Sequence, residues 1–137
     1  MTKTAIALVS FIGWSLALLI LMEVIRSYLV VTKQVVATKF VPDNENLSPF
    51  MQRLARAHLN CIEGLPVFGG LMMVAIATSQ TAITDSLALW CLLARVVQSS
   101  VHLISVGVVA VNLRFAAFAI QMAIGAIWVW ALLMALR

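Results

Sequence analysis

Four long apolar runs, separated by polar or turn-forming residues, dominate the hydrophobic pattern of the chain. The first covers about residues 5–31, and residues 5–22 within it carry no charge. The other three cover about residues 50–79, 84–110 and 113–136. Because about 20 apolar residues in a helix cross the hydrocarbon core of a bilayer, each run predicts one transmembrane helix.

The segments between these runs predict how the helices are connected. Residues 32–49 are rich in polar and turn-forming residues and form the one long loop. Ser48 followed by Pro49 is typical of a helix start, and Pro66 predicts a local bend in the second helix. The fold class expected for residues 1–137 is therefore an all-α membrane protein, a single domain built as a four-transmembrane-helix bundle.

Composition excludes a soluble domain. The sequence is 64% apolar and 10% charged, whereas soluble domains are about 45–50% apolar and about 25% charged. The net charge of +4 does not indicate a nucleic-acid partner, because the cations form no basic run. Cys61 and Cys91 both fall inside predicted spans and are expected to be packing residues rather than a disulfide.

The distribution of cations predicts an orientation in the membrane. Lys33 and Lys39 lie in the long loop, and further arginines flank it, whereas the other side of the bundle holds only Lys3 and Arg137. Loops rich in lysine and arginine stay in the cytoplasm. We therefore expect an integral, multi-pass protein with loop 32–49 cytoplasmic and both termini outside.

Polar side chains interrupt the start of the second run at helical spacing. Arg53, Arg56, Asn60 and Glu63 follow one another at i, i+3, i+7 and i+10, which places them on one face of a helix. A charge facing lipid at the membrane centre costs roughly 2.5–3.5 kcal/mol on insertion scales. This face is therefore predicted to contact protein, water or a ligand.

A second polar face lies on the third run, where Arg95, Gln98 and His102 are spaced at i, i+3 and i+7. Counted from the loop side, Glu63 and Arg95 lie roughly 18 Å and 16 Å deep at 1.5 Å per residue. Both depths fall near the middle of a core about 30 Å thick. The two side chains are therefore predicted to pair. His102 has no second ligand at metal spacing, so no metal site is expected.

Arginines outnumber carboxylates in the loop-side half of the predicted bundle. Glu23 and Arg26 share a helical face and are predicted to pair, and Arg114 is expected to open the fourth span. The full set is Arg26, Arg53, Arg56, Arg95 and Arg114 against Glu23 and Glu63. One interpretation is that buried ion pairs fix the helix register. The other is that surplus positive charge in one cavity binds an anion, although snorkelling of Arg53 and Arg114 to the interface would reduce that surplus.

The order of these residues resembles a known family. The second span reads Arg53-x-x-Arg56-Ala57-His58-x-Asn60-x-x-Glu63-x-x-Pro66-x-Phe68, which resembles the second-helix signature of the MAPEG family, the membrane-associated proteins in eicosanoid and glutathione metabolism. Arg95-Val-Val-Gln-Ser-Ser-Val-His102 and Arg114-Phe-Ala-Ala-Phe118 are two further matches. The resemblance covers nearly the whole chain and is greatest to compact bacterial members.

The resemblance implies a homotrimer that binds glutathione, as a co-substrate, between adjacent subunits. It implies contacts from Arg56, Asn60 and Glu63 to the tripeptide, and a catalytic role for Arg114, because a nearby cation favours the thiolate form of a thiol. The polar faces described above add further candidates for substrate binding, which are Arg53, Arg95, Gln98, His102 and Arg26.

The function implied is a membrane-bound glutathione transferase or peroxidase that conjugates or reduces lipophilic electrophiles reaching it through the lipid, in a bacterial inner membrane. One difference favours an alternative. Gln98 and His102 stand where eicosanoid-pathway members carry tyrosines, and the only tyrosine here is Tyr28. The alternative is a non-catalytic member of the family that binds a lipid or another anionic ligand between subunits.

Overall fold

The computed structural model describes all 137 residues and consists of helices joined by loops. The elements are α1 (Lys3–Val31), a 3₁₀ turn η1 (Ala37–Lys39), α2 (Pro49–Gly64), a π-helical turn η2 (Leu65–Gly69), α3 (Gly70–Ala77), α4 (Thr81–Ile104) and α5 (Val108–Ala135). α2, η2 and α3 run on without a break, so the chain has four helices long and apolar enough to cross a membrane. The predicted class, a four-helix membrane bundle, is confirmed.

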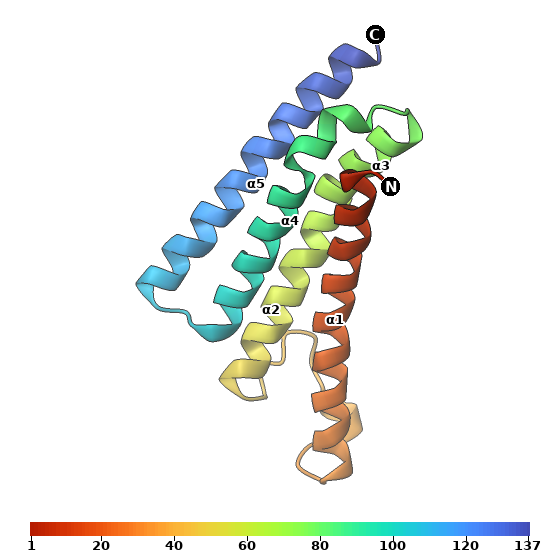
Figure 1. Ribbon diagram of the computed structural model, residues 1–137. Helices are drawn as coiled ribbons and strands as arrows, with labels where there is room; N and C mark the ends of the chain where they lie inside the picture. Colours follow the sequence, from red (N-terminus) through yellow and green to blue (C-terminus); the bar gives the residue numbers. More distant parts are fainter.

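The four helical rods lie side by side in alternating directions (Figure 1). Both termini lie at one end of the bundle, which we call the terminal end. Loop 32–49 and the α4–α5 connection lie at the other, the loop end (Figure 1). α4 contacts α1, α2, α3 and α5. Side chains that α4 turns inward are therefore shared between several helices.

Local features at two prolines follow the sequence prediction. Ser48 accepts a hydrogen bond from the Met51 amide through its hydroxyl (3.3 Å), and Pro49 is the first residue of α2. The disturbance expected at Pro66 takes the form of the π turn η2, in which the Gly70 amide donates to the Leu65 carbonyl five residues earlier. Proline supplies no amide hydrogen, so the regular i→i+4 ladder cannot pass through it unchanged.

The predicted boundary between the third and fourth spans was wrong. The expected spans were 84–110 and 113–136, whereas α4 ends at Ile104 and α5 begins at Val108. Ser105 is extended, and its hydroxyl accepts a hydrogen bond from the Gly107 amide (3.0 Å). Such a local side-chain bond competes with the helical ladder and ends the helix. Valines on both sides of this turn hid it in the hydrophobic pattern.

Two apolar clusters hold the bundle together. The first, toward the terminal end, includes Leu8, Phe11, Phe68, Met72 and Trp128. The second, toward the loop end, includes Leu18, Met22, Met51, Leu54 and Cys61. Both clusters contain residues of α1 and of the continuous helix formed by α2, η2 and α3.

Arg26 ties the long loop to the bundle. Its guanidinium forms the predicted ion pair with Glu23 (Nη1 to Oε1, 3.0 Å). It also donates through Nε to the Asn44 side-chain oxygen (3.1 Å). Asn44 is fully buried and donates in turn to the Met51 carbonyl (2.8 Å). The pairing of Arg26 with Glu23 is confirmed, and Arg26 serves to fix the loop.

Asp85 caps α1 from a neighbouring helix, and this contact gives a first testable prediction. One carboxylate oxygen accepts hydrogen bonds from the Thr4 amide (2.8 Å) and the Thr4 hydroxyl (2.6 Å). We expect Asp85→Ala to lower the free energy of unfolding in detergent, because both hydrogen bonds from Thr4 are lost, and Asp85→Asn, which still accepts, to lower it less. Ser86→Ala, at an exposed neighbour, is the control, and equal stability of Asp85→Ala and wild type would contradict the cap.

Candidate functional site

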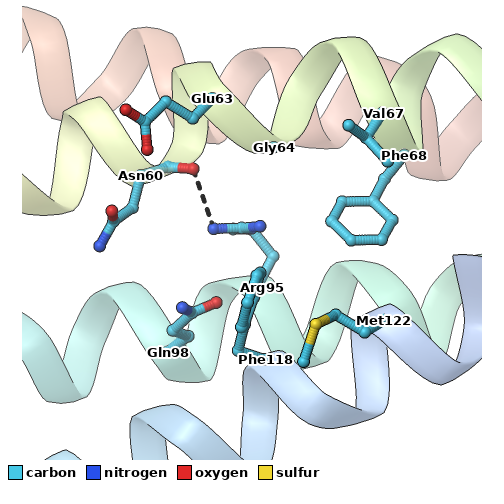
Figure 2. A pocket seen from close by; sticks show the side chains of 9 residues that line it. All are labelled: Asn60, Glu63, Gly64, Val67, Phe68, Arg95, Gln98, Phe118 and Met122. Atoms are coloured by element: carbon cyan, nitrogen blue, oxygen red, sulfur yellow. Dashed lines mark hydrogen bonds between the residues drawn. The ribbon is translucent and has the colours of Figure 1, made fainter.

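A cavity of about 370 Å³ lies between α2, η2, α4 and α5. We call it the central pocket. Its lining residues are Asn60, Glu63, Gly64, Val67, Phe68, Arg95, Gln98, Phe118 and Met122. Figure 2 shows that the pocket has two chemically distinct halves. Polar side chains gather on the side toward the loop end, and apolar side chains form the side toward the terminal end, with Arg95 between them.

Arg95 is the most unusual residue of the central pocket. It is only 2% exposed, and its Nη1 donates to the Asn60 backbone carbonyl (3.1 Å; Figure 2). Its guanidinium packs against the rings of Phe11 and Phe68, at 5.5 and 5.9 Å from their centroids. Nε and Nη2 are buried without a hydrogen-bond partner. A buried cation without a counter-charge is costly, so this group is suited to receive an anion.

Gly64 makes room for this guanidinium. A Cβ added at Gly64 would collide with Nη2 of Arg95 and lie 3.0 Å from its Cζ. The π turn that follows places the Phe68 ring beside the same guanidinium. π turns often occur at functional sites, because they re-aim side chains within an otherwise regular helix. Gly64 and the π turn η2 therefore together form the part of the central pocket that surrounds the Arg95 guanidinium.

The predicted ion pair between Glu63 and Arg95 does not form. The one salt bridge in the structure joins Arg26 and Glu23. Glu63 and Arg95 do line the same pocket, as their similar depths predicted. Glu63 is exposed and keeps its access to water, whereas Arg95 is drawn to the helix backbone at Asn60 through the gap left by Gly64. The pocket thus offers a carboxylate and a guanidinium, neither of which neutralises the other.

The opposite wall of the central pocket is a pair of amides. Gln98 accepts a hydrogen bond through Oε1 from Nε2 of Gln121 (2.9 Å), and the same Nε2 donates to the Ala117 carbonyl (3.0 Å). Gln121 is fully buried. Gln121 was not predicted, although an isolated amide in an otherwise apolar run was a usable signal. Phe118, which ends the third family match, was not assigned to a site, and Met122 has no feature in the pattern that distinguishes it from lipid-facing residues.

Three predicted site residues lie outside the central pocket, nearer the loop end. Arg53, Arg56 and His102 line a second cavity of about 170 Å³, which we call the loop-end pocket. Arg53 donates through Nε to the Leu103 carbonyl (3.0 Å). His102 is 4% exposed, and its Nδ1 has no partner. The expectation of one continuous cationic cavity is therefore wrong for the single chain, because the polar face of α2 serves two pockets in succession.

The remaining two candidates lie apart from the central pocket. Arg26 is engaged by the long loop, as described above. Arg114 lies in the second turn of α5, not at the start of the span as predicted, because α5 begins at Val108. It is half-buried, with a buried Nε that lacks a partner. It lines neither the central pocket nor the loop-end pocket.

Comparison with known proteins adds one result. The sequence model of the MAPEG family matches residues 4–134. No curated protein and no solved structure matches the chain.

Proposed function

The chain belongs to the MAPEG family, and on that premise we propose that it is a membrane-bound transferase or peroxidase that uses glutathione against lipophilic electrophiles. The observation that carries this proposal is the buried Arg95 without a counter-charge, set beside the exposed carboxylate of Glu63 in one pocket. A ligand that bears both an anion and a cation would satisfy both groups.

Glutathione has that chemistry, with two carboxylates, one ammonium group and one thiol. The free N–H groups of Arg95 suit an anionic group, since guanidinium binds carboxylate oxygens as a fork. Glu63 suits the ammonium, and the side-chain amide of Asn60 and the Nε2 group of Gln98, whose oxygen is bonded to Gln121, are free to bind the peptide groups. The apolar half of the pocket, around Phe68, then faces the thiol and suits a lipophilic second substrate.

The reaction proposed is attack by the glutathione thiolate. A free cysteine thiol has a pKa near 8.5, and a neighbouring cation raises the thiolate fraction at neutral pH. The sulfur forms a bond to the electrophilic carbon, the leaving group departs with its electron pair, and the thiol proton goes to water. Arg95 is the cation that lines the pocket. The family resemblance favours Arg114 instead. Arg114 would stabilise the thiolate if it reaches the ligand from an adjacent subunit.

We further propose that the protein is a homotrimer in which a neighbouring subunit closes this site. Arg56 and Glu63 are exposed in the single chain, and charges facing lipid are costly, which supports coverage of this face by protein. The bias of lysine and arginine supports a loop end that faces the cytoplasm. The mass of the detergent-solubilised assembly tests the trimer directly.

Activity and binding test the proposed function together. In detergent, the protein is expected to conjugate glutathione to chlorodinitrobenzene and to melt at a higher temperature when glutathione is present. Glu63→Gln removes the charge offered to the ammonium, and an exposed ion pair contributes up to about 1 kcal/mol. We expect its dissociation constant for glutathione to rise about fivefold. Glu45→Gln, at an exposed loop residue, is the control. Absence of both turnover and a thermal shift in wild type would refute the proposal.

A second function is favoured by the loop-end pocket. Arg53, Arg56 and His102 line it without any carboxylate, and the third span has no tyrosine to contact glutathione. These features suit a non-catalytic protein that binds a lipid or another anionic ligand. Native mass spectrometry distinguishes the two, because a retained phospholipid in place of glutathione, without conjugating activity, would favour the second.

A further inference from the structure

Two buried glutamines meet at the back of the central pocket, from helices that are neighbours in the bundle. Gln98 on α4 is 9% exposed, and Gln121 on α5 is fully buried. Gln121 donates through Nε2 to Gln98 Oε1 and to the Ala117 carbonyl. Figure 2 shows Gln98 reaching from α4 into the space below Asn60 and Arg95.

A single backbone carbonyl fixes the orientation of both amides. The Ala117 carbonyl can only accept a hydrogen bond, so the atom of Gln121 that faces it must be the amide nitrogen. That same nitrogen faces Gln98, so the atom of Gln98 that meets it must be the oxygen. If either amide were turned over, two acceptors or two donors would face each other in a buried place.

Gln98 therefore has its oxygen occupied and its nitrogen free. It lines the central pocket, and its Nε2 makes no hydrogen bond within the chain, so the group available to a ligand is a donor with two hydrogens. The chain's only tyrosine, Tyr28, is 61% exposed on α1 and cannot supply a hydroxyl donor here. The Gln98 amide, held in one orientation, supplies a hydrogen-bond donor in place of a tyrosine hydroxyl.

We propose that Gln121 is a positioning residue that holds Gln98 as a hydrogen-bond donor toward an acceptor atom of the bound ligand, either the sulfur or a carboxylate oxygen. The identity of the ligand rests on the proposed function. Without Gln121, the Gln98 amide has two nearly equivalent orientations, one of which turns an acceptor oxygen toward the anionic part of the ligand. The pair thus makes this wall of the pocket selective for acceptor groups.

A double-mutant cycle on the glutathione dissociation constant tests the coupling. One net hydrogen bond corresponds to about 0.5–1.5 kcal/mol, so Gln98→Leu and Gln121→Leu are each expected to raise the dissociation constant about three- to tenfold. The double variant is expected to be no weaker than Gln98→Leu alone, because Gln121 acts only through Gln98. Additive effects, or wild-type affinity in Gln121→Leu, would overturn the proposal. Gln80→Leu, the same change at the terminal end of α4, is the control for the substitution itself.

A second measurement needs no ligand and separates this inference from the proposed function. In protein labelled with ¹⁵N at glutamine, the side-chain amide protons of Gln121 are expected to exchange with water slowly and those of Gln98 faster, because only the former are hydrogen bonded. Equal or reversed rates would overturn the orientation. If the rates are as expected but wild type binds no glutathione, the proposed function fails while the locked donor stands.

Discussion

Replacing Arg95 by methionine is expected to weaken glutathione binding about 10- to 100-fold without making the empty protein less stable. Hydrogen bonds to a charged group contribute about 1.5–3 kcal/mol, and every 1.4 kcal/mol is a factor of ten in affinity. Arg95 has two buried nitrogens without a partner, so the ligand would supply the first hydrogen bonds that these atoms make. The dissociation constant from calorimetric titration in detergent measures the loss.

Most substitutions of buried residues lower the stability of the folded protein, whereas Arg95→Met is not expected to lower it. Burying a cation costs several kcal/mol, and replacing buried charges by apolar groups of similar volume is often neutral or stabilising. Methionine is an apolar side chain that suits the surroundings of Phe11 and Phe68, and it gives up the two cation–π contacts with these rings and the hydrogen bond to the Asn60 carbonyl. The melting temperature of unliganded Arg95→Met is therefore expected to equal or exceed that of wild type.

Two comparisons make the result interpretable. Arg114→Met removes the other candidate cation, which lines neither the central nor the loop-end pocket, so a smaller loss of affinity is expected there. Arg95→Lys keeps the charge but loses the planar fork and should lie between wild type and methionine. If Arg95→Met binds glutathione as wild type does but unfolds far more easily, Arg95 is a structural group and the central pocket is not the anion site.

The sequence predicted the rods of this bundle well because membrane insertion depends on length and hydropathy. The four apolar runs correspond to the four long helices. Helix ends are set by local hydrogen bonds instead. Ser48 at the start of α2 was recognisable, but the Ser105–Gly107 turn lies among valines and was not. Because the predicted span began at residue 113 and α5 begins at Val108, that error displaced Arg114 by five residues relative to the start of its helix.

The composition of the candidate site was only partly predictable, for a geometric reason. Residue spacing gives depth along a helix, and depth correctly brought Glu63 and Arg95 to one pocket. Depth does not say which atom a long side chain will reach. Arg95 met a backbone carbonyl and two aromatic rings rather than Glu63 because of an opening at Gly64, a feature that three-dimensional packing alone reveals.

The opening at Gly64 gives the second large predicted effect, which is a difference in glutathione binding between alanine variants of two glycines in the same long helix. Gly64→Ala is expected to weaken glutathione binding about tenfold while changing the free energy of unfolding little. The new methyl group would occupy the position of Arg95 Nη2, so the guanidinium must leave the Asn60 carbonyl and turn away from the ligand position. Loss of one charge-assisted hydrogen bond is about 1.5 kcal/mol, or about tenfold in affinity. Gly64 has ordinary helical angles (φ −77°, ψ −27°), so alanine adds no backbone strain, and its helix propensity offsets part of the steric cost.

Gly70→Ala is the matched control, because a Cβ at Gly70 would have no atom within 4 Å. Alanine is favoured over glycine in a helix by roughly 0.5–1 kcal/mol, so this variant is expected to be slightly more stable than wild type with unchanged affinity for glutathione. A selective loss of binding in Gly64→Ala, against none in Gly70→Ala, would assign the effect to the position of the Arg95 guanidinium rather than to the helix that carries both glycines. Equal affinity for glutathione in the two variants would mean that the position of the Arg95 guanidinium does not affect binding. The anion would then have to be held elsewhere, and the cationic loop-end pocket would be the next site to test.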